Sequence, residues 1–158
     1  SAASDVYKRQ VLSHYTLSQI NIEKLPVVLQ EICRVLKPGG LFVIVGSFSE
    51  GLMDEARRLT IALEKIHEKI FGSEEIDMKC ILRYIRDISC FDISLVKKLN
   101  DGRLDPTIKD FAEFLLSHTQ DEELRKQIVE IVRIGQKVGF REAPDYAIYV
   151  QKHIPSKR

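Results

Sequence analysis

The stretch Glu31–Val45 constrains the fold of this chain more than any other part of the sequence. Its first residues and those just before it carry apolar side chains at helical spacing (Leu25, Val28, Leu29, Ile32, Val35 and Leu36). Pro38 cannot continue a helix, and Gly39 and Gly40 permit the positive φ values of a reversal. Leu41–Val45 is then apolar without alternation, as in a strand that is covered on both faces. A helix followed directly by such a strand predicts a crossover unit of a parallel sheet.

The composition is that of an ordinary globular domain. The chain has 158 residues, of which 44% are hydrophobic and 30% are charged, and its formal net charge is +1. A balance so close to neutral gives no basic field for nucleic acid. No apolar run approaches the roughly 20 residues needed to span a bilayer. The sequence therefore predicts a soluble, cytoplasmic protein of one domain with no nucleic-acid or membrane partner.

The three cysteines, Cys33, Cys80 and Cys90, are scattered and odd in number. No Cys-x-x-Cys pair or Cys/His cluster accompanies them, so the sequence predicts no metal site. Cys33 and Cys80 fall near apolar helix faces, where free cysteines usually act as small core side chains. We therefore expect core thiols in a reducing compartment.

The first ten residues resemble the translation of a transposon-end adapter used to build sequencing libraries. Every residue from Ser1 to Gln10 matches that translation. The resemblance implies that residues 1–10 are a disordered artefact and that the biological sequence begins inside a gene, at about Val11. A natural flexible N-terminus is the alternative.

The remaining pattern predicts alternating strands and helices without a linker between domains. We expect a strand ending at Val11-Leu12, the helix and strand described above, and a helix capped by Ser49 that Gly72 ends. Further elements follow the same rules: a helix over 78–88 that Ser73 can cap, a strand over 91–99, helices from Asp105-Pro106-Thr107 and from Asp121 to Gly139, and a strand over 146–151. The predicted organisation is one domain over residues 11–152, with a helical insertion at about 105–139 and a polar tail at 153–158.

The segment Leu29-Gln-Glu-Ile-Cys-Arg-Val-Leu-Lys-Pro-Gly-Gly40, with the strand Leu41–Ile44, resembles class I S-adenosylmethionine-dependent methyltransferases of the small-molecule, type 11-like kind. The match is dense at this stretch, and beyond it the order of elements agrees through residue 152. The resemblance implies an α/β fold: a truncated Rossmann-like sheet of the last parallel strands and a closing antiparallel pair, with the helical insertion between the last two strands.

The resemblance also implies that most of the cofactor-binding half lies upstream of Val11. That half holds a glycine-rich turn after the first strand and an acidic residue after the second. No G-x-G-x-x-G spacing occurs in this sequence. We therefore expect the chain alone to bind S-adenosylmethionine weakly or not at all, to be inactive, and to be marginally stable.

Candidate site residues follow from the rule that ligands bind outside the carboxyl ends of strands in open α/β sheets. The first such end is Ser13, His14 and Tyr15, which the resemblance places near the methionine part and methyl group of the cofactor. His14 is a weak catalytic candidate as a general base, with loop capping as its alternative role. The second end offers Ser47 and Phe48 for substrate contact, although both suit a plain entry into the next helix.

Three functions remain open at this point. The first is part of an enzyme that transfers a methyl group from S-adenosylmethionine to a small molecule. The second is a catalytically silent protein of the same fold that serves as an interaction module. The third is another Rossmann-like enzyme with a nucleotide cofactor, such as a nicotinamide-dependent dehydrogenase. The sequence upstream of Val11 would discriminate between them.

Overall fold

A computed structural model describes residues 7–49, 51–72 and 76–156 of the chain. The described residues form two units, each with its own apolar core. The sheet unit holds residues 7–49, 76–99 and 145–156, and the helical unit holds residues 51–72 and 100–144.

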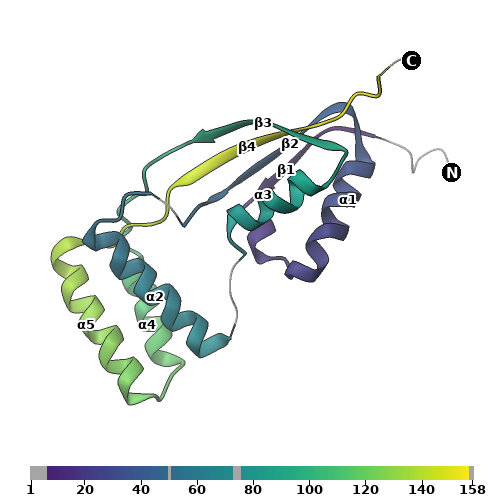
Figure 1. Cartoon of the computed structure of the whole chain (residues 1–158). Coiled ribbons are helices and arrows are strands. Elements are labelled where there is room, and N and C mark those ends of the chain that lie inside the picture. The colour runs from purple at the N-terminus through teal and green to yellow at the C-terminus, as the bar shows by residue number, and fades with distance from the viewer. Residues whose placement is uncertain (1–6, 50, 73–75, 157–158) are drawn as a thin grey trace. The chain divides into compact units, whose positions relative to one another are not determined.

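The sheet unit contains four strands in the order β1-β2-β4-β3. Strands β1 (Lys8–His14) and β2 (Leu36–Ser47) run parallel, whereas β4 (Asp145–Lys152) lies antiparallel to both β2 and β3 (Phe91–Lys98). The predicted parallel strands and closing antiparallel pair are therefore confirmed. Figure 1 shows these strands side by side.

Helices α1 (Leu25–Val35) and α3 (Met78–Asp87) pack against the same face of this sheet. One apolar cluster joins Leu29 of α1 and Ile81 of α3 to alternate residues of the strands, among them Phe42, Ile148 and Val150. We call this the near face of the sheet and its opposite the far face. Short 3-10 turns at Leu17–Gln19 and Ile22–Lys24 lead from β1 into α1.

The glycine-rich stretch differs from its prediction as a separate turn. Helix α1 ends at Val35, and Leu36 already pairs with Lys8 as the first residue of β2. Of the two adjacent glycines, only Gly39 takes a positive φ, at 77°, and the pairing register of β1 with β2 shifts in this region. Strand β1 likewise begins at Lys8, so residues 8–10 belong to the sheet rather than to the disordered segment that we expected. Residues 1–6 of that segment lie outside the described residues.

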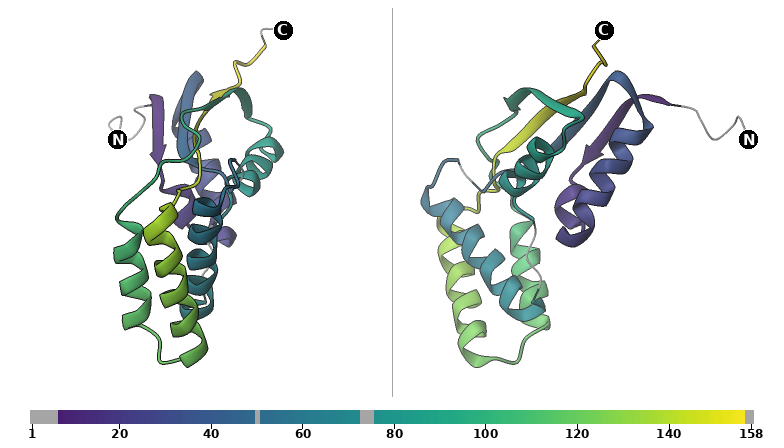
Figure 2. Two further views of the ribbon diagram at one scale, coloured as in Figure 1. Left: turned by 90° about the vertical axis from the view of Figure 1, so that its left-hand side faces the viewer. Right: turned by 45° about the vertical axis from the view of Figure 1, so that its right-hand side comes forward.

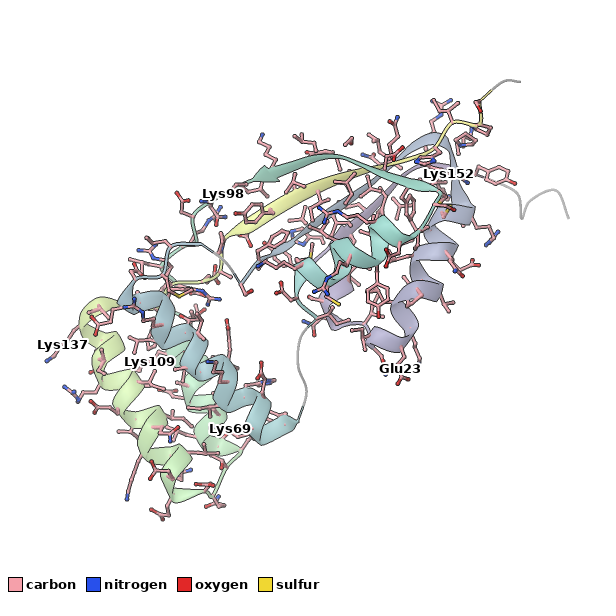
Figure 3. All side chains as sticks on the ribbon, in the orientation of Figure 1. Glu23, Lys69, Lys98, Lys109, Lys137 and Lys152 are labelled. Carbon is pink, nitrogen blue, oxygen red and sulfur yellow. A yellow bond between two sulfur atoms is a disulfide. The ribbon has the colours of Figure 1, made fainter. Side chains whose placement is uncertain are left out.

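The carboxyl end of α1 is held by the last residue of β4. Lys152 Nζ donates to the carbonyl oxygens of Cys33 and Leu36, at 2.6 and 2.8 Å. A cation at this position suits both the unpaired carbonyl groups and the negative end of the helix dipole. Figure 3 shows Lys152 beside this end of the helix.

A disulfide between Cys33 and Cys90 corrects the prediction of free core thiols. The two residues are 57 positions apart, but the end of α1 and the start of β3 meet, so their Cα atoms lie 6.6 Å apart. This separation is within the range that a disulfide spans. Among the described residues, Cys80 is the free cysteine. The spacing of the cysteines along the chain contained no sign of this contact.

The helical unit consists of α2 (Glu55–Phe71), α4 (Ile108–Ser117) and α5 (Glu122–Val138), which pack against one another (Figure 2). The predicted insertion therefore contains two of its three helices. The third, α2, precedes them in the sequence, with α3 and β3 in between. Their shared core is formed by residues from all three helices and by Phe140 (Leu59, Leu63, Ile66, Ile108, Ala112, Leu115, Ile128 and Phe140).

Capping residues were predicted with mixed success. Asp121 caps α5 by accepting from the amides of Glu123 and Leu124, and Gly72 ends α2 in the left-handed conformation, both as predicted. However, Asp54 rather than Ser49 caps α2, and Ser49 donates instead to the Asp77 carboxylate. Asp77 caps α3, and Ser73, the predicted cap, lies outside the described residues. Helix α4 begins two residues after Pro106.

Candidate functional site

The carboxyl ends of β1 and β2 meet at one edge of the sheet. His14, the last residue of β1, pairs with Val45, and the amide of Tyr15 donates to the Val45 carbonyl at 2.9 Å. The parallel register thus brings the two predicted site segments, residues 13–15 and 47–48, to a common edge. This is the edge where open α/β sheets bind their ligands.

Ser13 and His14 point to opposite faces at this edge because side chains alternate along a strand. Ser13 lies opposite Ile44 on the near face and is 8% exposed. Its hydroxyl is buried and has no hydrogen-bond partner among the described residues. His14 lies beside Val45 on the far face and is exposed. One ligand at the strand end can therefore meet the two side chains only from different sides.

Tyr15 turns the chain away from the sheet. Its φ of 54° is in the left-handed region, which tyrosine adopts rarely. The Tyr15 ring lies edge-on to the His14 ring, with 4.5 Å between the ring centroids. Backbone outliers of this kind often accompany functional sites. The contact restricts the position of His14, so the two residues form a pair rather than independent ligands.

Ser47 has a partner that the sequence did not reveal. Its hydroxyl donates to the Asp145 carboxylate, 3.1 Å away, across the antiparallel pairing of β2 with β4. Asp145 is partly exposed at the first position of β4. We therefore add this carboxylate to the candidate site. Only the pairing of β2 with β4 identifies it, because the two residues are 98 positions apart.

Phe48 is 7% exposed and belongs to the core of the sheet unit. Its ring packs edge-on against Tyr146, with 4.6 Å between centroids. The preceding glycine, Gly46, makes room for α3, because a Cβ atom there would lie 2.8 Å from the sulfur of Met78. These contacts favour a packing role for Phe48 over the predicted substrate contact.

Two histidines of the helical unit, the partly buried His67 and the exposed His118, border a row of aromatic rings. The His67 ring lies 4.7 Å from Phe71, and the His118 ring lies 4.2 Å from Phe114. Phe71 and Phe114 are themselves nearly parallel, with 5.7 Å between centroids. Sequence spacing could not show this row, because it joins α2 to α4.

The helical unit also has a groove of about 480 Å³ between α2 and α5. Its floor includes Ile66, and three lysines line it (Lys65, Lys69 and Lys126). The two carboxylates in its lining are engaged within α5: Glu123 accepts from Gln127, and Glu130 from Arg133. The hydrogen bond and charge of Arg133 hold the pKa of Glu130 below its usual value.

The part of the chain that the structure describes contains no group of three or more His, Cys, Asp or Glu side chains arranged to bind a metal ion. None of its helices is both long and apolar enough to cross a membrane.

Comparisons with known proteins rest on structure, since no protein-family model and no curated protein sequence matches the chain. A cyclopropane-fatty-acyl-phospholipid synthase-like protein from Lactobacillus casei ATCC 334 aligns with a TM-score of 0.60 at 10% identity, over 94% of this chain and 57% of its own. A protein assigned as a methyltransferase, from Bacillus halodurans C-125, aligns with a TM-score of 0.57 at 11% identity, over 95% of this chain and 66% of its own.

An S-adenosylmethionine-dependent methyltransferase from Methanosarcina mazei aligns with a TM-score of 0.55 at 14% identity, over 96% of this chain and 62% of its own. The chain thus spans less than two thirds of the length of each of these proteins. At such identities the likeness concerns the fold alone. The chain therefore has the α/β fold of a part of the S-adenosylmethionine-dependent methyltransferases, as its helix–strand signature predicted.

Proposed function

We propose that this chain is the carboxyl-terminal part of an S-adenosylmethionine-dependent methyltransferase that acts on a small molecule. The observation that supports the proposal best is the common edge formed by residues 13–15 and Ser47, in a fold shared with such enzymes. The near-neutral net charge argues against a nucleic-acid substrate. We extend the same proposal to a cytoplasmic location, against which the Cys33–Cys90 disulfide weighs.

The residues at this edge fit the polar end of the cofactor. The Ser13 hydroxyl is buried and without a partner among the described residues, and native proteins seldom leave such a group unpaired. A carboxylate or ammonium group bound at the strand end would satisfy it. We therefore assign Ser13, His14 and Tyr15 to the cofactor, as the sequence predicted, with the rest of the cofactor site upstream of Val11.

S-adenosylmethionine, when bound, supplies an electrophilic methyl group that passes to the acceptor atom while its sulfur becomes a neutral thioether. The task of this chain is then to position the acceptor, because alignment supplies much of the rate of such a transfer. Ser47 and Asp145, hydrogen-bonded to each other, offer a hydroxyl and a carboxylate for that purpose. His14 is exposed on the far face of the sheet, to which Ser47 also points, and can take up the proton that the acceptor loses.

The first test is the polypeptide sequence upstream of Val11 in the parent gene. A glycine-rich turn followed about 20 residues later by an acidic residue supports a nucleotide cofactor. Degenerate residues at both places would instead support the catalytically silent interaction module. This observation requires no purified protein and separates those two functions.

The second test is transfer of a labelled methyl group by the parent protein to a panel of small metabolites. The His14→Ala variant is expected to lose about 100-fold in kcat, the usual contribution of a general base. The control is Ser94→Ala, which removes a hydroxyl that donates to the Tyr149 carbonyl in the strand pair β3–β4. Absence of both methyl transfer and cofactor binding in the wild-type parent would refute the proposal.

The chain by itself is expected to bind the cofactor weakly. Calorimetric titration of residues 11–158 with S-adenosylhomocysteine should show no saturable binding in the micromolar range. A micromolar dissociation constant would show that the cofactor site is complete within this chain. The proposal that the main binding half lies upstream would then be wrong.

A further inference from the structure

One arginine of the helical unit is buried. Arg57, in the first turn of α2, is 3% exposed, and among the described residues it is the one charged residue that is buried. It lies about 200° round the helix from Leu59, so its side chain stands apart from the apolar cluster of α2, α4 and α5. Removing a guanidinium group from water is costly unless other partners replace the water. The partners of Arg57 therefore decide whether its burial is compensated.

The guanidinium of Arg57 is poorly paired. It carries five N–H donors, of which Nη1 donates to Glu64 Oε1 at 3.3 Å, whereas Nε is buried and has no partner among the described residues. The distance to Glu64 exceeds the roughly 2.7–2.9 Å of charge-assisted hydrogen bonds. The Glu64 side chain is also 49% exposed, so its charge is screened by water. Glu64 thus compensates only a part of the buried charge.

Other arginines of the chain show what the unpaired side of a guanidinium binds. Nε and Nη2 project in the same direction and match two oxygens of a carboxylate or phosphate group. Arg34 directs both of them at Glu31, at 3.0 and 2.9 Å, and Arg133 directs both at Glu130. Those two pairs are exposed, whereas an unmade hydrogen bond costs most in a buried group. No described residue supplies the corresponding oxygen to Nε of Arg57.

We propose that Arg57 binds an oxyanion, the carboxylate or phosphate group of a small-molecule ligand, through Nε and Nη2. Such a group would pair the buried Nε and add the negative charge that Glu64 supplies only in part. The half-exposed Glu64 side chain shows that a carboxylate can reach the guanidinium from the solvent. The amide of Arg57 takes no part, because it donates to the Asp54 carboxylate. This site belongs to the helical unit and is independent of the proposed methyl transfer.

Thermal unfolding of the 158-residue chain tests the site, with inorganic phosphate and acetate as probes and sodium chloride at equal ionic strength as the reference. At ten times its dissociation constant, an anion that binds only the folded protein raises the melting temperature by roughly 3–6 °C. We expect this rise in the wild type and its loss in Arg57→Lys, which keeps the charge without the planar fork. Phosphate also stabilises proteins without binding to them, so the informative quantity is the difference between the two proteins. The probe with the larger difference identifies the group that Arg57 binds.

Two further variants make the test specific. Arg133→Lys is the matched control, because Arg133 is exposed and already directs Nε and Nη2 at Glu130. It should keep the whole anion effect. Glu64→Gln removes a carboxylate that repels the ligand, so it should tighten phosphate binding about threefold to fivefold. Because Glu64→Gln leaves Arg57 in place, it tests the site even if Arg57→Lys does not fold.

The Nε–H proton of Arg57 gives a direct signal in nuclear magnetic resonance, assigned through its own side-chain carbons. A hydrogen bond to an oxyanion should move this signal downfield as phosphate or acetate is added. If Arg57 serves only as a structural partner of Glu64, neither anion moves it. Equal anion effects in the wild type and Arg57→Lys, or an unmoved Nε–H signal, would overturn the proposal. So would phosphate binding that Glu64→Gln leaves unchanged. A parent protein without methyl transfer would leave these outcomes as they are, since none of them involves the cofactor.

Discussion

Replacing Ser13 by alanine should stabilise the protein. The Ser13 hydroxyl is buried, has an accessible area below 1 Å², and has no hydrogen-bond partner among the described residues. Leaving a buried hydroxyl unpaired costs about 1–3 kcal/mol relative to a residue without it. Alanine removes this cost and keeps the Cβ atom in place. The cavity left by the removed hydroxyl is on the order of 10 Å³, and at about 24 cal/mol per Å³ it destabilises the protein by only about 0.2 kcal/mol. We therefore expect a net gain of about 1 kcal/mol.

The assay is urea unfolding followed by far-ultraviolet circular dichroism, with thermal unfolding as a second measure. A gain of about 1 kcal/mol should raise the melting temperature by roughly 2–4 °C in a chain of this size. The control is Ser47→Ala, because the Ser47 hydroxyl donates to Asp145 at 3.1 Å. Loss of that hydrogen bond should lower the free energy of unfolding by about 0.5–1.5 kcal/mol.

The outcome that refutes this reasoning is equal destabilisation by the two serine substitutions. Ser13 would then have a partner within the chain in solution. If Ser13 instead pairs with the cofactor, Ser13→Ala should weaken cofactor binding in the parent about tenfold, which corresponds to about 1.4 kcal/mol. Stability gained together with affinity lost is typical of residues at functional sites.

Three further substitutions test the packing and the charges. Gly135→Ala should lower the urea midpoint, although alanine favours a helix by about 1 kcal/mol over glycine, because the alanine Cβ would lie 2.1 Å from the buried Phe140 ring. In a Phe140→Leu background the same substitution should no longer lower the midpoint. A higher midpoint for Gly135→Ala alone would contradict this reasoning. Lys152→Met should cost about 1–2 kcal/mol by releasing two carbonyl groups at the end of α1, and an unchanged midpoint would show that water replaces them. The hydrogen bond from the Arg57 amide, and after it the Arg141 guanidinium, lower the pKa of Asp54 in the folded protein. The ionised Asp54 carboxylate therefore stabilises the fold above the unfolded pKa of about 3.9, and this stabilisation is lost as the pH falls through the lower folded pKa. The urea midpoints at pH 3 and pH 7 should therefore differ less in Asp54→Asn than in the wild type, and equal differences in the two proteins would contradict this.

Local patterns in the sequence predicted those features that depend on neighbouring residues. The apolar spacing before Val35 and the continuous apolar run after Gly40 correctly gave α1 and β2. Gly72 and Asp121 marked helix ends because a left-handed cap and a carboxylate cap act within one turn. Such signals require no knowledge of the rest of the fold.

Contacts between distant segments could not be predicted in this way. The apolar stripe of α2 shows that the helix is covered, but it does not show that α4 and α5 cover it rather than the sheet. The Cys33–Cys90 disulfide and the Ser47–Asp145 hydrogen bond depend likewise on which strands become neighbours. The sequence could not decide between Ser49 and Asp54 as the cap of α2, because both are good capping residues. Only the observed start of the helix at Glu55 identifies Asp54 as the cap.

The glycine-rich stretch that identified the fold is unsuited to hold a phosphate group. Gly39 and Gly40 lie near the amino end of β2, whereas ligands of open α/β sheets bind at the carboxyl ends. A Cβ atom on Gly40 would lie 2.8 Å from the Lys37 carbonyl oxygen and 3.1 Å from that of Arg9, so the close approach of β1 to β2 requires glycine there. The same approach sets the parallel register that aligns His14 with Val45 at the other end of the strands. The stretch therefore acts on the candidate site only through the register, and substitution of Gly40 should disturb both ends of the pair together.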